Sequence, residues 1–138
     1  MLVDSNILIY AINKDSPKYK TAIKFLEKNK FDLVFAHQNI IEAIKVLTQQ
    51  KYSHPITPQL ATNAVLLIAN ASRIISPNNI TYPIVLDYIK KFKLSGNRIF
   101  DAYLAATAIS NGIYEIATDN SKDFKKFTEL KILNPFVR

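Results

Sequence analysis

Residues 1–11, MLVDSNILIYA, constrain how the rest of the chain can be arranged. The apolar start predicts a short buried strand over 1–4, and the apolar run after it predicts a first helix over 6–12. Asp4 stands at the junction between the two. Because an isolated buried carboxylate is costly, we expect Asp4 to be hydrogen-bonded, paired with a charge or bound to a cation.

Outward from this stretch, strands and helices alternate along the chain. Apolar runs predict strands at 1–4, 31–36, 73–76, 114–118 and 130–133, and apolar residues at helical spacing predict helices at 6–12, 16–29, 38–50, 58–72, 82–94, 99–110 and 121–127. This alternation predicts an α/β fold with three α/β/α layers and a mainly parallel central sheet of four to five strands.

Capping residues mark several of the predicted helix ends. Ser16 before Pro17 predicts one helix start, and Thr57 before Pro58 predicts another. Gly112 predicts a left-handed helix end, because glycine adopts that backbone conformation without strain.

Composition limits the function further. The 138 residues are 49% hydrophobic and 21% charged, which predicts one globular domain over 1–138. Two glycines are too few for a glycine-rich phosphate loop, and the lack of cysteine excludes disulfides and thiolate metal sites. With no membrane-length apolar run and no signal-like start, we expect a cytoplasmic protein without a membrane partner. The net charge of +7 is compatible with a polyanionic partner.

Five acids lie where such a sheet would gather them. Asp4 ends the first strand, Asp119 follows the fourth, and Asp123 comes four residues later. Asp101 lies in the first turn of a helix, and Glu42 lies at the margin of another helix's apolar stripe. Because strand ends and the following helix starts share one edge of a parallel sheet, we expect these acids to converge there.

Converging carboxylates repel one another unless some are protonated or a cation lies between them. Oxygen ligands without histidine or cysteine suit Mg²⁺ or Mn²⁺, which commonly serve phosphate chemistry. Arg98 and Lys45 lie near the same edge and are candidates to hold phosphates.

Most of these acids also have a purely structural interpretation. Glu42 is the hardest to explain that way, because an acid beside an apolar stripe gains nothing from capping. Roles as helix caps or first-turn acids remain open for the others, namely Asp4, Asp101, Asp119 with Asn120, and Asp123.

Five stretches, taken in this order, resemble the PIN-domain ribonucleases and most closely the VapC-type toxins: LVDSNILIYA, NIIEAIKVL, NRIFDAYLAATAISNG, IATDNSKDF and LNPF. The resemblance extends over essentially the whole chain. It implies Mg²⁺- or Mn²⁺-dependent cleavage of RNA phosphodiester bonds, a homodimer and a partner antitoxin. The alternative is a non-catalytic PIN-like module that binds RNA or protein.

The resemblance also implies roles for single residues. Asp4, Glu42 and Asp101 match the three most regular acids of the family, so we expect them to be catalytic and to hold the metal. Ser5 stands beside the first acid, where it is placed to hydrogen-bond that acid or a substrate phosphate. Asn6 is expected to fix the turn that presents both.

The fourth acidic position departs from the family pattern. Members usually have an acid or asparagine two residues after the threonine of the last strand, and that place is Asn120 here. Asp119 lies one residue earlier, and Asp123 matches another frequent acid. The fourth site member is therefore Asp119, Asn120 through water, or Asp123. The residues expected to contact the substrate are Ser5, Asn6, Arg98 and Asn120.

Overall fold

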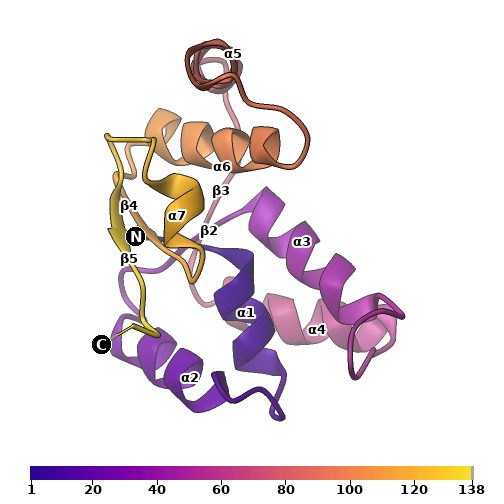
Figure 1. Cartoon of the computed structure of the whole chain (residues 1–138). Coiled ribbons are helices and arrows are strands. Elements are labelled where there is room, and N and C mark those ends of the chain that lie inside the picture. Colours follow the sequence, from indigo (N-terminus) through magenta and orange to yellow (C-terminus); the bar gives the residue numbers. More distant parts are fainter. Residues whose placement is uncertain (138) are drawn as a thin grey trace.

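The computed structural model describes residues 1–137, and its centre is a five-stranded sheet in the order β3-β2-β1-β4-β5 (Figure 1). Every neighbouring pair of strands is parallel, which confirms the predicted α/β class. The strands are β1 (Leu2–Val3), β2 (Val34–Ala36), β3 (Arg73–Ile75), β4 (Glu115–Ala117) and β5 (Lys131–Leu133).

Helices cover both faces of the sheet, as the alternating pattern predicted. In Figure 1, α1 to α4 lie on one side of the sheet, and α6 and α7 lie on the other with α5 outside α6. The helices are α1 (Ser5–Ile12), α2 (Tyr19–Lys28), α3 (His37–Thr48), α4 (Pro58–Ala69), α5 (Thr81–Phe92), α6 (Arg98–Ser110) and α7 (Ser121–Phe124).

The central strand β1 sends its two side chains into two separate cores. Leu2 packs in the core beneath α5, α6 and α7, and Val3 packs in the core beneath α1 to α4. Both side chains are fully buried, because successive residues of a strand point to opposite faces. Burial on both faces explains why so short a strand is entirely apolar.

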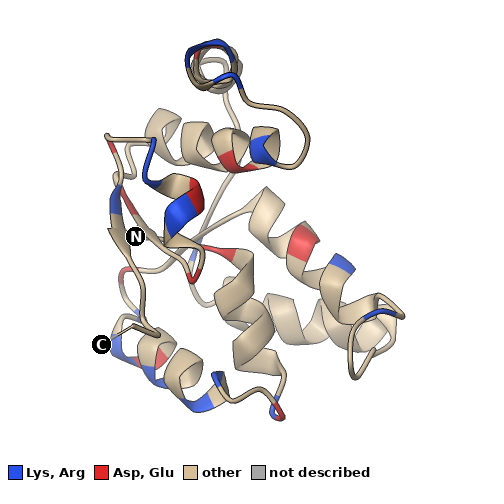
Figure 2. Cartoon of the chain, in the orientation of Figure 1, with Lys and Arg blue, Asp and Glu red and all other residues tan. Residues whose placement is uncertain are grey.

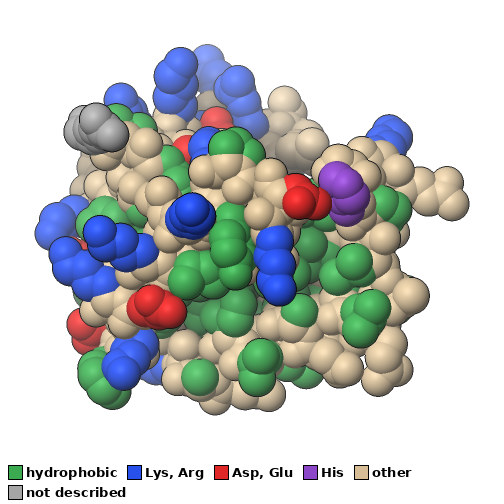
Figure 3. Space-filling model, turned by 90° about the horizontal axis from the view of Figure 1, so that it is seen from below, with side chains coloured by type: hydrophobic (Ala, Val, Ile, Leu, Met, Phe, Trp, Pro, Cys, Tyr) green, Lys and Arg blue, Asp and Glu red, His purple; other side chains and the backbone are tan. Residues whose placement is uncertain are grey.

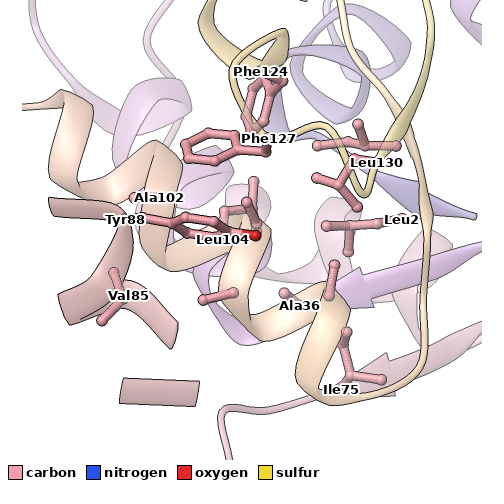
Figure 4. Close-up of a cluster of buried hydrophobic side chains, with 14 of the residues drawn as sticks. Leu2, Ala36, Ile75, Val85, Tyr88, Ala102, Leu104, Phe124, Phe127 and Leu130 are labelled. Atoms are coloured by element: carbon pink, nitrogen blue, oxygen red, sulfur yellow. The ribbon is translucent and has the colours of Figure 1, made fainter. Parts of the chain in front are cut away.

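Aromatic rings fill the core on the α6 side of the sheet. The rings of Tyr88 and Phe127 lie 4.8 Å apart between centroids, and Phe92 lies 5.8 Å from Phe127. Figure 4 shows Tyr88, Phe124 and Phe127 gathered beside Leu104. These contacts join α5 to the segment after α7, so the last part of the chain is packed onto this face.

Two predicted caps are confirmed. The Thr57 hydroxyl accepts a hydrogen bond from the Leu60 backbone N–H at 3.2 Å, at the start of α4. Gly112 has a φ of 73°, and the Ile113 N–H bonds to the Ala108 carbonyl at 2.9 Å, which ends α6 in a Schellman motif.

Several predicted boundaries are wrong: the helices predicted to end at 72 and 127 end at Ala69 and Phe124, and two elements start later than predicted. Helix α2 begins at Tyr19 rather than at residue 16, because the Ser16 hydroxyl accepts from the Lys18 N–H in a preceding turn. Strand β2 begins at Val34 rather than at residue 31, because the Asp32 N–H bonds back to Asn29 in a turn. Local side-chain and turn hydrogen bonds thus shorten both elements.

Positive charge is unevenly spread over the surface. Figure 3 shows basic side chains mainly along the left and upper parts of the face seen from below, with apolar side chains near its centre. Helix α2 carries three exposed lysines, Lys20, Lys24 and Lys28. Within residues 1–137, no helix combines the length and the apolar composition that crossing a bilayer requires.

We expect Phe127→Ala to lower the free energy of unfolding by about 3–5 kcal/mol, because it removes a fully buried ring and leaves a cavity. Urea unfolding followed by circular dichroism measures this. The control is Phe31→Ala, since Phe31 is 90% exposed and should change stability little. Equal losses in the two variants would contradict the packing described for this core.

Candidate functional site

Asp4 directly follows β1 and is the N-cap of α1. The residue is only 7% exposed, and its carboxylate accepts hydrogen bonds from the Ser5 backbone N–H at 2.8 Å and the Thr118 hydroxyl at 2.7 Å. The Asn6 amide donates a further bond at 3.2 Å. The expectation that this carboxylate is hydrogen-bonded is confirmed. Asp4 caps α1 and still lies at the sheet edge, directly after β1.

Thr118 is a site residue that the sequence analysis missed. It is fully buried directly after β4, and its hydroxyl donates to Asp4. The same hydroxyl oxygen accepts from the Asn6 amide at 3.3 Å and from the Asn120 backbone N–H at 3.0 Å. Its position one residue past a buried parallel strand was the available signal, because Asp4 occupies the same position after β1.

Glu42 lies in α3 with both carboxylate oxygens hydrogen-bonded. The Ser5 hydroxyl donates to Oε2 at 3.0 Å, and the Gln38 amide donates to Oε1 at 2.8 Å. The same Gln38 nitrogen also donates to the Phe100 carbonyl at 3.0 Å. Gln38 therefore ties α3 to the first turn of α6. The sequence analysis missed it, although it precedes Glu42 by four residues, where helical side chains meet.

Asp101 lies in the first turn of α6, where other acids surround it. Burial raises the pKa of Asp101 to about 6, and the charges of Asp123, Asp4 and Glu42 add to that rise against the opposing charge of Lys126. Figure 2 shows the acidic segments of α3, α6 and α7, and the one directly before α1, around one shared region. The folded chain thus brings together acids that lie far apart in sequence.

Asp4 experiences the same crowding. Burial raises its pKa above the usual value, and the charge of Glu42 adds to the rise. Hydrogen bonds from Thr118 and Ser5 act in the opposite direction but do not outweigh the burial. Asp4 and Asp101 therefore both hold their protons more tightly than free aspartates do.

The donor chemistry of these acids fits a hard divalent cation. They offer carboxylate oxygens only, and a cation between them would remove the repulsion that raises the pKa of Asp101. Within residues 1–137, however, no three or more His, Cys, Asp or Glu side chains lie close enough together to hold one ion. That Asp4, Asp101 and Glu42 hold a metal therefore stays a prediction, and Asp123 lies near Asp101 as a further acid.

The carboxylate of Asp119 contacts Lys18 and Tyr10 and not the other acids of the site. Its carboxylate forms an ion pair with Lys18 and accepts a hydrogen bond from the Tyr10 hydroxyl at 2.8 Å. The Lys18 ammonium also lies 5.1 Å from the Tyr10 ring centroid and 5.3 Å from that of Phe136. Burial acts to raise the pKa of Asp119, but the bonds from Lys18 and Tyr10 outweigh it and leave that pKa below the usual value. Its catalytic role stays a prediction.

The other predicted substrate-binding residues lie on or directly beside the elements that carry the acids. Asn6 links Asp4 to the β4 end, because its side-chain oxygen accepts from the Asp119 N–H at 3.4 Å. Arg98 is the exposed first residue of α6, and Asn120 is exposed just before α7. Their contact with a substrate stays a prediction.

We expect the metal-free protein to lose stability as the pH rises from about 4 to about 7. The folded-state pKa of Asp101 is about 6 against 3.8 in the unfolded chain, so the folded state binds the extra proton in this window. Asp101→Asn removes the charge and should be more stable than wild type at pH 7 by about 1 kcal/mol, after discounting for solvent screening. Urea unfolding in EDTA at several pH values measures the difference, which should vanish near pH 4. A variant less stable than wild type at pH 7 would argue against crowding of the acids.

Lys18→Met, Asp119→Asn and the double variant should show a coupling free energy of about 1 kcal/mol in a double-mutant cycle, because the pair is only partly exposed. Thermal unfolding of the four proteins measures the coupling. If Asp119 has a supporting role only, the two single variants should behave alike in an assay for the RNA cleavage that the family resemblance implies. A selective loss of cleavage in Asp119→Asn would instead favour its predicted catalytic role.

Comparisons with known proteins agree with this geometry. The family profile described as "PIN domain" matches residues 1–130. The chain is 28% identical to VapC ribonuclease Mb2897 of Mycobacterium bovis, over 98% of this chain and 95% of that protein. It is 26% identical to ribonuclease VapC24 of Mycobacterium tuberculosis, over 98% of this chain and 96% of that protein.

Solved structures share the fold. A toxin–antitoxin complex from Klebsiella pneumoniae superposes with a TM-score of 0.72 at 19% identity, covering 99% of this chain and 98% of that one. VapBC2 from Rickettsia felis, bound to a DNA fragment from its promoter, gives 0.69 at 20% identity, with 96% of each chain covered. With the family profile spanning residues 1–130, the chain belongs to the PIN-domain family.

Proposed function

We propose that this protein is a Mg²⁺- or Mn²⁺-dependent endoribonuclease that hydrolyses RNA phosphodiester bonds. The observation that carries the proposal is the environment of Asp101, whose pKa of about 6 reflects burial and the nearby charges of Asp123, Asp4 and Glu42. A bound cation would relieve the repulsion between these carboxylates, so the site is suited to bind a cation together with the substrate. The ribonuclease names of the VapC relatives support the same activity.

Asp4 and Asp101 would hold the metal, with Glu42 completing the site directly or through water. When bound, the ion supplies positive charge for the scissile phosphate and lowers the pKa of a water molecule. Thr118 and Ser5 keep Asp4 oriented by hydrogen bonds, and Ser5 with Gln38 fixes both oxygens of Glu42. In the overall reaction water adds to phosphorus and the bond to the 3′-oxygen breaks, which leaves a 5′-phosphate and a 3′-hydroxyl.

We also propose that the protein is the toxin of a toxin–antitoxin pair. The VapC relatives and the structural neighbours solved as toxin–antitoxin or VapBC complexes support an antitoxin as its protein partner. The homodimer implied by the resemblance stays a prediction, which the oligomeric state in solution would test.

Asp101→Asn should lower Mn²⁺-dependent cleavage of single-stranded RNA by at least about 100-fold, because even outer partners of metal sites commonly contribute 10- to 100-fold. Isothermal titration with Mn²⁺ should show binding to wild type and a strongly weakened binding to the variant. Asp101 is a better test than Asp4, because an asparagine amide at position 4 would face the donating amide of Asn6.

The matched control is Asp87→Asn, since Asp87 is an exposed acid of α5 outside the site. A folded Asp101→Asn protein with full cleavage would contradict the assigned site. A wild-type protein that neither binds Mn²⁺ nor cleaves RNA would instead identify a non-catalytic PIN-like module.

A further inference from the structure

A groove of about 770 Å³ lies between α3 and α6, and both Glu42 and Asp101 line it. Apolar side chains also line this groove, including Ile41, Phe100 and Tyr103. Its volume is in the range of sites that hold small molecules or single nucleotides. Whatever fills the groove lies directly beside two of the acids that would hold the metal.

Two large apolar side chains in this groove are exposed. Ile41 is 65% exposed and precedes Glu42, and Phe100 is 58% exposed and precedes Asp101. Core packing explains neither position, because both side chains lie outside the two buried cores. Exposed apolar side chains gathered in one groove are typical of a binding site.

Gln38 fixes the backbone that carries Phe100. Its amide nitrogen donates to the Phe100 carbonyl at 3.0 Å and to Glu42 at 2.8 Å. Phe100 is also in the first turn of α6, so its backbone is held by a helix as well as by this cross-link. The backbone from which the aromatic ring projects is therefore held at a set position relative to Glu42, which reduces the backbone entropy lost on binding.

We propose that the groove is a nucleobase subsite, in which the base of an unpaired nucleotide next to the cleaved phosphate stacks on Phe100. Among residues 1–137, the aromatic pairs do not include Phe100, so the faces of its ring are not used in packing against another ring. Stacking of bases on aromatic side chains is a general means of binding single-stranded RNA. This inference rests on the proposed ribonuclease function and restricts its substrate to unpaired RNA.

The remaining lining of the groove suits a base better than an apolar peptide. His37 and Asn97 line it with polar side chains that can hydrogen-bond to the edges of bases. Lys45 also lines the groove and supplies a positive charge for a neighbouring phosphate. A flat ring, polar side chains and the cationic Lys45 together match the base and the phosphate of a nucleotide.

The test measures binding rather than cleavage, in the Asp101→Asn background with Mg²⁺ present. The probes are a fluorescently labelled single-stranded oligoadenylate and a strand of the same length that lacks all bases. We expect the oligoadenylate to bind about ten-fold more tightly than the abasic strand, as stacking of one base predicts. Phe100→Leu keeps an apolar side chain without a ring and should abolish that difference, whereas Phe100→Tyr should retain it.

Phe31→Leu is the matched control, because Phe31 is an exposed phenylalanine that does not line this groove. It should bind both strands as the parent does. Unchanged oligoadenylate binding in Phe100→Leu, or equal binding of the two strands by the parent, would overturn the subsite and leave the groove to a protein partner. Ring-dependent binding by a wild type that cleaves no RNA would support the subsite and refute the ribonuclease function, so the two failures are distinguishable.

Discussion

The structure depends on a carboxylate that is buried at the end of its central strand. Asp4 is placed there by β1, and burial makes its charge costly unless donors surround it. Ser5 and Asn6 provide donors from the start of α1, and Thr118 provides one from 114 positions away. The backbone of Asp4 also donates to the Ala117 carbonyl at 2.9 Å. The bonds that satisfy the charge are thus the bonds that hold the ends of β1 and β4 together.

The fold places other acids near this carboxylate, so electrostatic repulsion between carboxylates remains in the folded state. Asp101 and Glu42 are held near Asp4 by α6 and α3, and Ser5 and Gln38 keep Glu42 in place. A sequence selected for stability alone would replace one of these acids by a neutral residue. Their joint presence is understandable if the site is selected for a cation and for phosphate chemistry, at some cost in stability.

Much of this arrangement is predictable from the sequence, because parallel strands impose strong patterns. Apolar runs identified all five strands, and the rule that strand ends share one edge brought Asp4 and Asp101 together. Boundaries were less predictable, since the turn before Tyr19 depends on a single Ser16 hydrogen bond.

Residues whose roles depend on side-chain direction were also hard to predict. Thr118 and Asp119 are neighbours in the chain, yet only Thr118 bonds to Asp4, while Asp119 bonds to Lys18 and Tyr10. Strand β4 ends at Ala117 and Asp119 lies in a bend, so the direction of each side chain is set by this turn and not by a regular pattern that the sequence reveals. Composition and spacing place both residues at the correct edge but do not distinguish between them.

The pairing of β1 with β4 has a consequence for how the molecule comes into being. Strand β1 lies between β2 and β4, so the middle of the sheet stays incomplete until the ribosome has added residues near 117. Contacts between segments so distant in sequence form late in folding. The chain is proposed to cut RNA. The messenger RNA that encodes it is therefore not exposed to a completed cleavage site during most of its translation.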